Sequence, residues 1–328
     1  MASIYIEQWL DGPAGHSFYT RTYPAPSPRA VVIFVHGFAD HISRYEDAHS
    51  HFAEHGITVF AYDLRGFGRT ALDKQRRSED ECYGKTSRLL ELNDLQWWVN
   101  YVSREYPQKP IFLLGYSAGG GLTLAFATRS GPPPKPEAIT LVSGIIAQAP
   151  LVHLRYPVPK VLRHIVHALG NVLPWWPIPA SLPLERFSRD PHVVQSLQVD
   201  PLRRAHGTAR GLHDMITQGE ELLDTDFEHW PNDLPLLMTW GTADEVCHDS
   251  FRAPSALITR LQQANCPKAG VAFFDKVIAK DKRLVLYDGA VHDLLHEADG
   301  IPAKVIDEYC TWIEAHLDVR RCGSSVDG

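Results

Sequence analysis

The sequence lacks the features that mark several classes of protein. No stretch reaches the roughly 18 unbroken apolar residues of a membrane-spanning helix, and no basic segment leads into an apolar one at the N-terminus. The five cysteines show no CxxC pairing, so we expect neither a disulfide framework nor a zinc site. With 32 basic and 39 acidic residues, the net charge of −7 offers no general positive field to nucleic acid. We therefore expect a cytoplasmic protein with reduced cysteines that binds no nucleic acid.

What is present is the composition of a folded, core-forming chain. Hydrophobic residues make up 44% and charged residues 22% of 328 residues. At roughly 100 to 200 residues per domain, this length predicts two domains or one large α/β unit. The eight tryptophans are more than a core of this size requires.

Short apolar runs alternate with amphipathic segments along most of the chain. Strands are predicted over residues 3–10, 16–23, 30–35, 58–61, 111–114, 138–142, 235–240 and 283–287. Helices are predicted over residues 45–55, 89–106, 118–129 and 301–317. Continuous apolar runs are typical of parallel strands that are buried on both faces. The alternation therefore predicts an α/β fold with a doubly wound sheet.

One long interval interrupts the alternation. Residues 147–232 are rich in Pro, His, Leu and Trp, and they contain no run typical of a buried strand. We interpret them as a mostly helical cap, inserted into an α/β core formed by residues 1–146 and 233–328. Such an insertion lies over the carboxyl ends of the strands, where open sheets bind ligands. Within it, Trp175 and Trp176 stand beside prolines and either face a membrane interface or fill the core of the cap.

The segment Gly115-Tyr116-Ser117-Ala118-Gly119 has the form G-x-S-x-G. It directly follows a predicted buried strand and directly precedes a predicted helix. The two glycines permit a sharp turn that presents the serine hydroxyl above the sheet. The segment does not have the G-x-G-x-x-G spacing of a dinucleotide-binding fold. We therefore predict that Ser117 is a catalytic nucleophile.

A serine nucleophile needs a base, and the base needs an orienting carboxylate. In this architecture the acid and then the histidine follow the serine, each in the loop after a late strand. Asp244 follows the strand at 235–240, and His292 follows the strand at 283–287. We predict that they are the acid and the base. The residues that compete for these roles are Asp249, Asp288, Asp293 and His296.

The same chemistry needs two N–H donors for the oxyanion that forms on the attacked carbonyl. Ala118, the residue after the nucleophile, is expected to supply one, and Phe38, after the strand at 30–35, the other. These groups handle the charge without help, so no metal or organic cofactor is expected.

Several further segments extend the pattern in the same chain order. They are His36–Tyr45 (HGFADHISRY), Tyr62–Gly68 (YDLRGFG), Asp200-Pro201-Leu202, Gly241–Cys247 (GTADEVC) and Tyr287–His292 (YDGAVH). With the serine motif, they resemble the α/β-hydrolase superfamily and, within it, the monoacylglycerol lipase family. The resemblance implies the α/β-hydrolase fold, with a mostly parallel central sheet, helices on both faces and a helical cap.

The resemblance also implies a function. The expected reaction is hydrolysis of a long-chain monoacylglycerol to free fatty acid and glycerol, through an acyl-enzyme intermediate. A lysophospholipase or general carboxylesterase is the nearest alternative, and a non-catalytic hydrolase fold that binds a small molecule is an alternative of another class. The cap of such lipases docks on membranes, which implies a cytoplasmic protein that associates peripherally with membranes or lipid droplets.

Substrate-binding residues follow from the resemblance as well. Asp40 stands where many members of the family have glutamate, and Arg44 is kept; both are expected near the glycerol end of the pocket. Tyr116 is expected to contact substrate. Cys247 matches a cysteine that lines the site in animal members, or it is a small buried residue without a role in the reaction. Phe38 replaces an alanine of the animal members, and residues 265–282 are a longer stretch than theirs.

Overall fold

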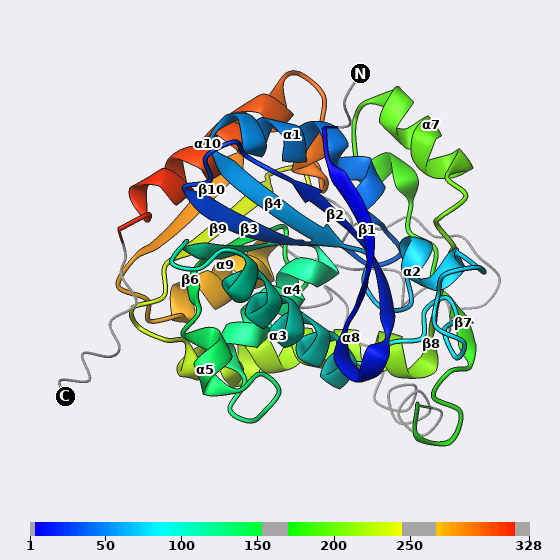
Figure 1. Cartoon of the computed structure of the whole chain (residues 1–328). Helices are drawn as coiled ribbons and strands as arrows, with labels where there is room; N and C mark the ends of the chain where they lie inside the picture. Colours follow the sequence, from blue (N-terminus) through cyan, green and yellow to red (C-terminus); the bar gives the residue numbers. More distant parts are fainter. Residues whose placement is uncertain (1–3, 153–169, 245–266, 319–328) are drawn as a thin grey trace, which may run out of the picture.

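An eight-stranded sheet forms the centre of the computed structural model, which describes residues 4–152, 170–244 and 267–318 (Figure 1). The strand order is β1-β2-β4-β3-β5-β6-β9-β10. The strands are β1 (Ile6–Asp11), β2 (Ser17–Tyr23), β3 (Ala30–Val35), β4 (Ile57–Tyr62), β5 (Ile111–Tyr116), β6 (Val142–Gln148), β9 (Leu236–Gly241) and β10 (Lys282–Tyr287). The fold confirms the predicted α/β class.

Continuous apolar sequence accounts for the middle of the sheet. Every residue of β3, β4, β5, β6 and β9 is buried, and neighbouring strands among them pair in parallel. At one edge, β1 and β2 form an antiparallel hairpin closed by the 3₁₀ turn η1 (Pro13–Gly15), and β2 pairs antiparallel with β4. The carboxyl ends of the parallel strands therefore meet at one edge of the sheet, where ligands bind in open α/β folds.

Helices cover both faces of the sheet. Figure 1 shows α1 (Glu46–Glu54) and α10 (Ile301–Ala315) on one side, and α3 (Arg88–Glu105) and α4 (Ala118–Thr128) on the other. Each face has its own apolar cluster: Phe52 and Ile313 belong to one, and Trp98 to the other. The remaining helical elements outside the 147–232 segment are η2 (Ile42–Tyr45), α2 (Gly68–Leu72), α5 (Pro136–Ile139), α9 (Pro267–Lys276) and η5 (Leu294–His296).

The described part of the predicted cap contains the helices α7 and α8, a helical end at residues 170–172 and a small sheet. It comprises β7 (Pro177–Pro179), η3 (Leu184–Arg186), α7 (Pro191–Val199), β8 (His206–Thr208), α8 (Ala209–Asp224) and η4 (Asp226–His229). β7 and β8 pair antiparallel, a feature that the apolar pattern did not predict. α8 packs against α3 and α4, so this segment closes over the start of α4.

Two stretches differ from the sequence-based prediction. The strand predicted over residues 138–142 is wrong: residues 136–139 form the helical turn α5, with Pro136 at a position where its missing N–H costs nothing. The strand β6 instead starts at Val142, and its apolar run is broken by Ser143 and Gly144. In the 265–282 stretch, α9 packs its buried Phe273 into the core, and Val277, directly after the helix, is buried in the same cluster.

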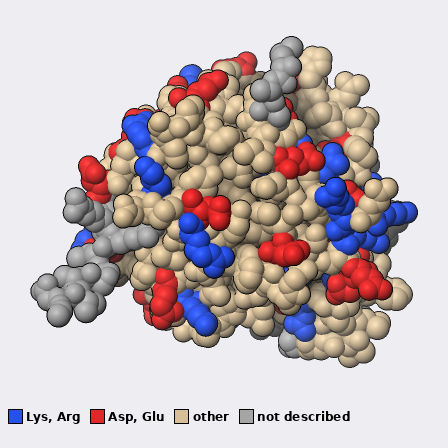
Figure 2. Space-filling view, viewed as in Figure 1, with Lys and Arg blue, Asp and Glu red and all other residues tan. Residues whose placement is uncertain are grey.

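Charged side chains are mixed over the surface. Figure 2 shows basic and acidic side chains next to one another on the face in view, with wide uncharged areas between them. Among the helices of the described ranges, none has the length and hydropathy needed to cross a bilayer.

Candidate active site

Ser117 lies in the turn between β5 and α4, with φ of 55° and ψ of −118°. A positive φ is strained for a residue with a side chain, and such strain persists where the surroundings enforce it. A Cβ on Gly115 would lie 2.4 Å from the carbonyl oxygen of Gly119, and one on Gly119 would lie 2.3 Å from that of Val35. Both glycines of the motif are therefore required by close backbone approach. The Ser117 N–H donates to the carbonyl of Gln148 at 2.9 Å, which ties the turn to β6.

His292 and Asp244 complete a hydrogen-bonded series with this serine. His292 Nε2 lies 3.0 Å from Ser117 Oγ, and His292 Nδ1 lies 2.8 Å from Asp244 Oδ2. The relative exposure of His292 is 1% and that of Asp244 is 4%. In this geometry an imidazole can take the proton of the serine hydroxyl while the carboxylate fixes its tautomer. The alternative base, His296, instead binds the Asp293 carboxylate and the carbonyl of Arg44.

Trp240 is a site residue that the sequence analysis missed. Its indole N–H donates to Asp244 Oδ2 at 2.7 Å, and the side chain is fully buried at the end of β9. The same carboxylate oxygen therefore accepts from Trp240 and faces His292 Nδ1, which fixes the direction of the carboxyl group. A tryptophan four residues before an aspartate is no distinctive motif, so only the structure reveals this contact.

The two expected oxyanion donors lie at the start of a cavity. Neither the Phe38 N–H nor the Ala118 N–H forms a hydrogen bond with the described part of the chain. Ala118 is the first residue of α4, where backbone N–H groups have no partner within the helix. Both residues line the same cavity.

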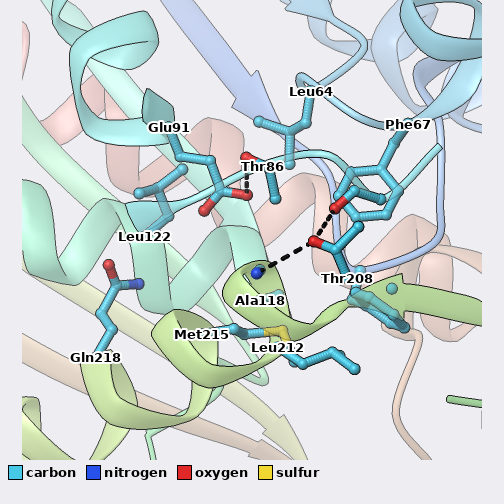
Figure 3. Close-up of a pocket in the computed structure, with 14 residues that line it drawn as sticks. Leu64, Phe67, Thr86, Glu91, Ala118, Leu122, Thr208, Leu212, Met215 and Gln218 are labelled. Carbon is cyan, nitrogen blue, oxygen red and sulfur yellow. Dashed lines mark hydrogen bonds between the residues drawn. The ribbon is translucent and has the colours of Figure 1, made fainter. Parts of the chain in front are cut away.

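That cavity extends between α3, α4 and α8 (Figure 3). Its apolar wall consists of Phe38, Leu64, Phe67, Leu122, Leu212 and Met215. Its polar side chains are Thr86, Glu91, Thr208 and Gln218. A second cavity lies on the other side of Phe38, between that residue, η3 and α7, and includes Arg203. Phe38 thus lines both cavities.

Comparison with known proteins identifies the family. The family model described as serine aminopeptidase, S33, matches residues 26–299, a range that holds Ser117, Asp244 and His292. The chain belongs to this family. A relative in this group of hydrolases, the monoacylglycerol lipase of Mycolicibacterium smegmatis, is 28% identical over 306 residues, covering 90% of this chain and 91% of the relative. The monoglyceride lipase of Rattus norvegicus is 26% identical over 302 residues, covering 90% and 86%.

A solved structure supports the same fold. The soluble variant of monoglyceride lipase from Saccharomyces cerevisiae, in complex with a substrate analog, aligns with a TM-score of 0.77 at 23% identity and covers 96% of both chains. The resemblance to monoacylglycerol lipases and the α/β-hydrolase fold are confirmed. This member of the serine aminopeptidase S33 family is a hydrolase of the lipase and esterase type.

Asp40 and Arg44 form a buried network in this S33 family member. Arg44 donates to Asp40 at 2.9 Å and to Asp293 at 3.1 Å, and Tyr45 donates to Asp40 at 2.6 Å. Burial alone would raise the pKa of Asp40, but the Arg44 guanidinium outweighs it and holds that pKa well below its usual range. At Asp293, burial again raises the carboxyl pKa, but His296 and Arg44 outweigh it, so the pKa of Asp293 is also lowered. The network joins the loop that carries Phe38 to the loop that carries His292.

The other two predicted substrate-binding residues have different outcomes. Tyr116 is buried with its ring 5.2 Å from that of His292, centroid to centroid. Its hydroxyl has no hydrogen-bond partner among the described residues, and burial raises its pKa well above the usual range. Cys247 lies outside the described residues, as does Asp249. Substrate contact by Asp40, Arg44 and Tyr116 stays a prediction.

Proposed function

We propose that this protein hydrolyses long-chain monoacylglycerols to free fatty acid and glycerol. The observation that carries the proposal is the 3.0 Å contact between Ser117 Oγ and His292 Nε2, with Asp244 on the far side of the imidazole. The largely apolar cavity that starts at Phe38 and Ala118 suits an acyl chain. The names of the relatives from Mycolicibacterium smegmatis and Rattus norvegicus support an acylglycerol substrate.

The proposed reaction uses only groups of the chain and water. Ser117 Oγ attacks the ester carbonyl while His292 accepts its proton, and the N–H groups of Phe38 and Ala118 stabilise the oxyanion. Collapse of the tetrahedral intermediate expels glycerol, which takes the proton from His292, and leaves the acyl group on Ser117. A water molecule, deprotonated by His292, then attacks the acyl-enzyme and releases the fatty acid. Asp244 holds the imidazole and stabilises its positive charge throughout.

A panel of esters tests the substrate class. We expect the purified protein to hydrolyse monoolein with a higher kcat/KM than diolein, triolein or a lysophospholipid, because the largely apolar wall of the cavity suits a single acyl chain. Initial rates of fatty acid release, with the Ser117→Ala protein as background, measure this preference. An alanine anilide in the same panel checks for the peptidase activity that the family description names.

Each result of the ester panel would indicate a different function. A lysophospholipid that exceeds monoolein in kcat/KM would assign the protein to the lysophospholipases instead. Similar kcat/KM values for all the esters of the panel would indicate a general carboxylesterase. No turnover above the Ser117→Ala background would exclude an enzyme and favour a binding protein.

We also propose that the enzyme reaches its substrate at membrane or lipid-droplet surfaces through the segment before β7. Four apolar side chains are exposed there: Val172 (77%), Leu173 (47%), Trp175 (39%) and Trp176 (58%). Their neighbourhood is held by the backbone, since the N–H groups of Ala209 and Arg210 donate to the carbonyls of Trp176 and Pro174. Aromatic side chains on a fixed loop suit the interface between lipid and water.

Replacing Trp175 and Trp176 with serine is expected to weaken binding to phosphatidylcholine liposomes by about tenfold, because two exposed aromatic rings no longer enter the interface. Turnover of soluble p-nitrophenyl butyrate should stay near the wild-type value. Liposome co-sedimentation and the esterase assay measure the two properties, and Trp97→Ser, at an exposed tryptophan on α3, is the matched control. Equal loss of both properties would show that the two rings support the fold instead.

A further inference from the structure

The cavity contains a carboxyl group that the proposed reaction does not use. Glu91 belongs to the first turn of α3, and Figure 3 shows its side chain turned toward the cavity. Thr86 Oγ1 donates to Glu91 Oε1 at 3.1 Å. The other carboxyl oxygen has no hydrogen-bond partner in the described part of the chain. A carboxyl group in the wall of an apolar pocket is costly unless something binds it.

A second polar side chain projects toward the same space from another helix. Gln218 of α8 lines the cavity and is 5% exposed. The oxygen of its amide is buried, without a hydrogen-bond partner among the described residues. Buried polar atoms are almost always paired, so an unpaired one beside a cavity points to a missing ligand. Leu122, one helical turn after Ala118 on α4, lines the cavity as well.

Burial, supported by neighbouring carboxylates, raises the pKa of the Glu91 carboxyl group and favours its neutral form. Burial raises the pKa of Glu91 to about 8, although the hydrogen bond from Thr86 lowers it; Asp94 on α3 and Asp214 on α8 raise it further. Arg65, the cation that acts on Glu91, is engaged by both oxygens of Asp94 at 2.7 and 2.9 Å. Below pH 8 Glu91 therefore carries a proton and can donate a hydrogen bond; above pH 8 it can only accept.

We propose that Glu91 and Gln218 determine specificity by binding a hydroxyl group on the acyl chain of the substrate, partway along its length. A hydroxyl group accepts from the Glu91 O–H and donates to the Gln218 carbonyl oxygen, which satisfies both side chains. An unsubstituted chain would cover them without a partner, and a site built to bind a hydroxyl disfavours the analogue that lacks it. This inference rests on the proposed ester hydrolysis at Ser117, because the acyl chain enters the cavity from there.

A positional series of esters tests the inference: methyl decanoate and the methyl esters of 4-, 6-, 8- and 10-hydroxydecanoic acid. Binding is measured by calorimetry on Ser117→Ala protein, which does not consume the ester. We expect one isomer to bind at least about tenfold more tightly than methyl decanoate. Adding Glu91→Leu or Gln218→Leu should reduce this ratio to about one, whereas Glu91→Gln, whose amide still donates, should retain most of it.

The pH dependence of this affinity ratio is a second measurement, and it would not change if Glu91 had only a structural role. The ratio should fall above pH 8, where Glu91 ionises, and should stay constant with pH in the Glu91→Gln protein. Glu105→Gln, at an exposed glutamate at the other end of α3, is the matched control and should leave the ratio unchanged. Circular dichroism establishes that each variant is folded.

The outcomes separate the inference from the proposed function. Equal binding of all five esters, or a preference that survives both leucine variants, would overturn the inference. Turnover of monoolein by the wild-type protein tests the chemistry independently. Hydrolysis without any hydroxyl preference would refute the inference alone, and a hydroxyl preference in binding without hydrolysis would refute the proposed function alone.

Discussion

Replacing Ser117 with alanine is expected to lower kcat for monoolein by about 10⁴-fold or more, and His292→Ala should have the same effect. The two side chains act as one unit, since the imidazole 3.0 Å from Ser117 Oγ has no function without the nucleophile. The double variant should therefore be no slower than either single variant. Asp244→Ala should be about tenfold to a hundredfold less severe, because a misoriented base retains part of its activity. Single-turnover measurements on purified variants determine these values.

Suitable controls lie on α1, away from the site. Ser50→Ala and His51→Ala remove a serine and a partly exposed histidine from this helix and should leave kcat unchanged. Near wild-type activity of the His292→Ala protein would transfer the role of base to another group, and His296 would be the first to examine.

The same series tests Trp240 as a positioning residue. Trp240→Phe keeps an aromatic ring in the core but removes the N–H that binds Asp244 Oδ2. We expect kcat to fall by about tenfold, from the net value of a hydrogen bond to a charged group. KM should be unchanged, because the ring does not line either cavity next to Phe38. A change in KM alone would show that the tryptophan acts on substrate binding instead.

Sequence patterns predicted the strands that are apolar along their length. They did not predict the strand whose burial depends on its neighbours in the sheet. The runs that became β3, β4, β5 and β9 are almost wholly apolar, with Thr58 and Thr239 as the polar exceptions, so each pattern predicts a strand buried on both faces. β6 is equally buried, yet it contains a serine, a glycine and a glutamine, so the apolar pattern predicts a strand in the stretch before it. The pattern therefore reports hydropathy, whereas burial in β6 is set by its neighbours β5 and β9.

Some residues of the candidate active site could be predicted from the sequence, and others could not. Ser117, Asp244 and His292 could be placed from the sequence, because the order of motifs and strands restricts each to one loop. Their surroundings could not: Trp240, which binds Asp244, looks like an ordinary core residue, and Glu91, which lines the cavity, looks like an ordinary acid in the first turn of a helix. Their surroundings come from residues 4 positions away in the sequence, as Asp244 is from Trp240, and 127 positions away, as Gln218 is from Glu91. Only the three-dimensional arrangement contains that information.

Arg44→Ala is expected to lower the free energy of unfolding by about 3 to 5 kcal/mol, the usual cost of removing one partner from a buried ionic network. Arg44 binds Asp40 and Asp293, and both carboxylates are buried, so its loss leaves two negative charges with reduced compensation. Urea denaturation at pH 7 measures the loss. Arg29→Ala is the matched control: its bond to Glu314 is half exposed on both sides, and such pairs contribute about 0 to 1 kcal/mol.

Acidity should change the size of this effect in a known direction. The folded-state pKa values of Asp40 and Asp293 are lowered, so their stabilising contribution is present above the ordinary carboxyl pKa of about 4 and is lost as the pH falls through the folded-state values. Without Arg44 the buried carboxyl groups take up protons at higher pH, which relieves the uncompensated charge. The difference between wild type and Arg44→Ala should therefore be largest near pH 7 and shrink toward pH 4. A difference that is independent of pH would mean that Arg44 stabilises the two loops through packing of its aliphatic stem. A loss of stability no larger than that of Arg29→Ala would show that the ionic network does not hold the Phe38 loop against the loop of His292.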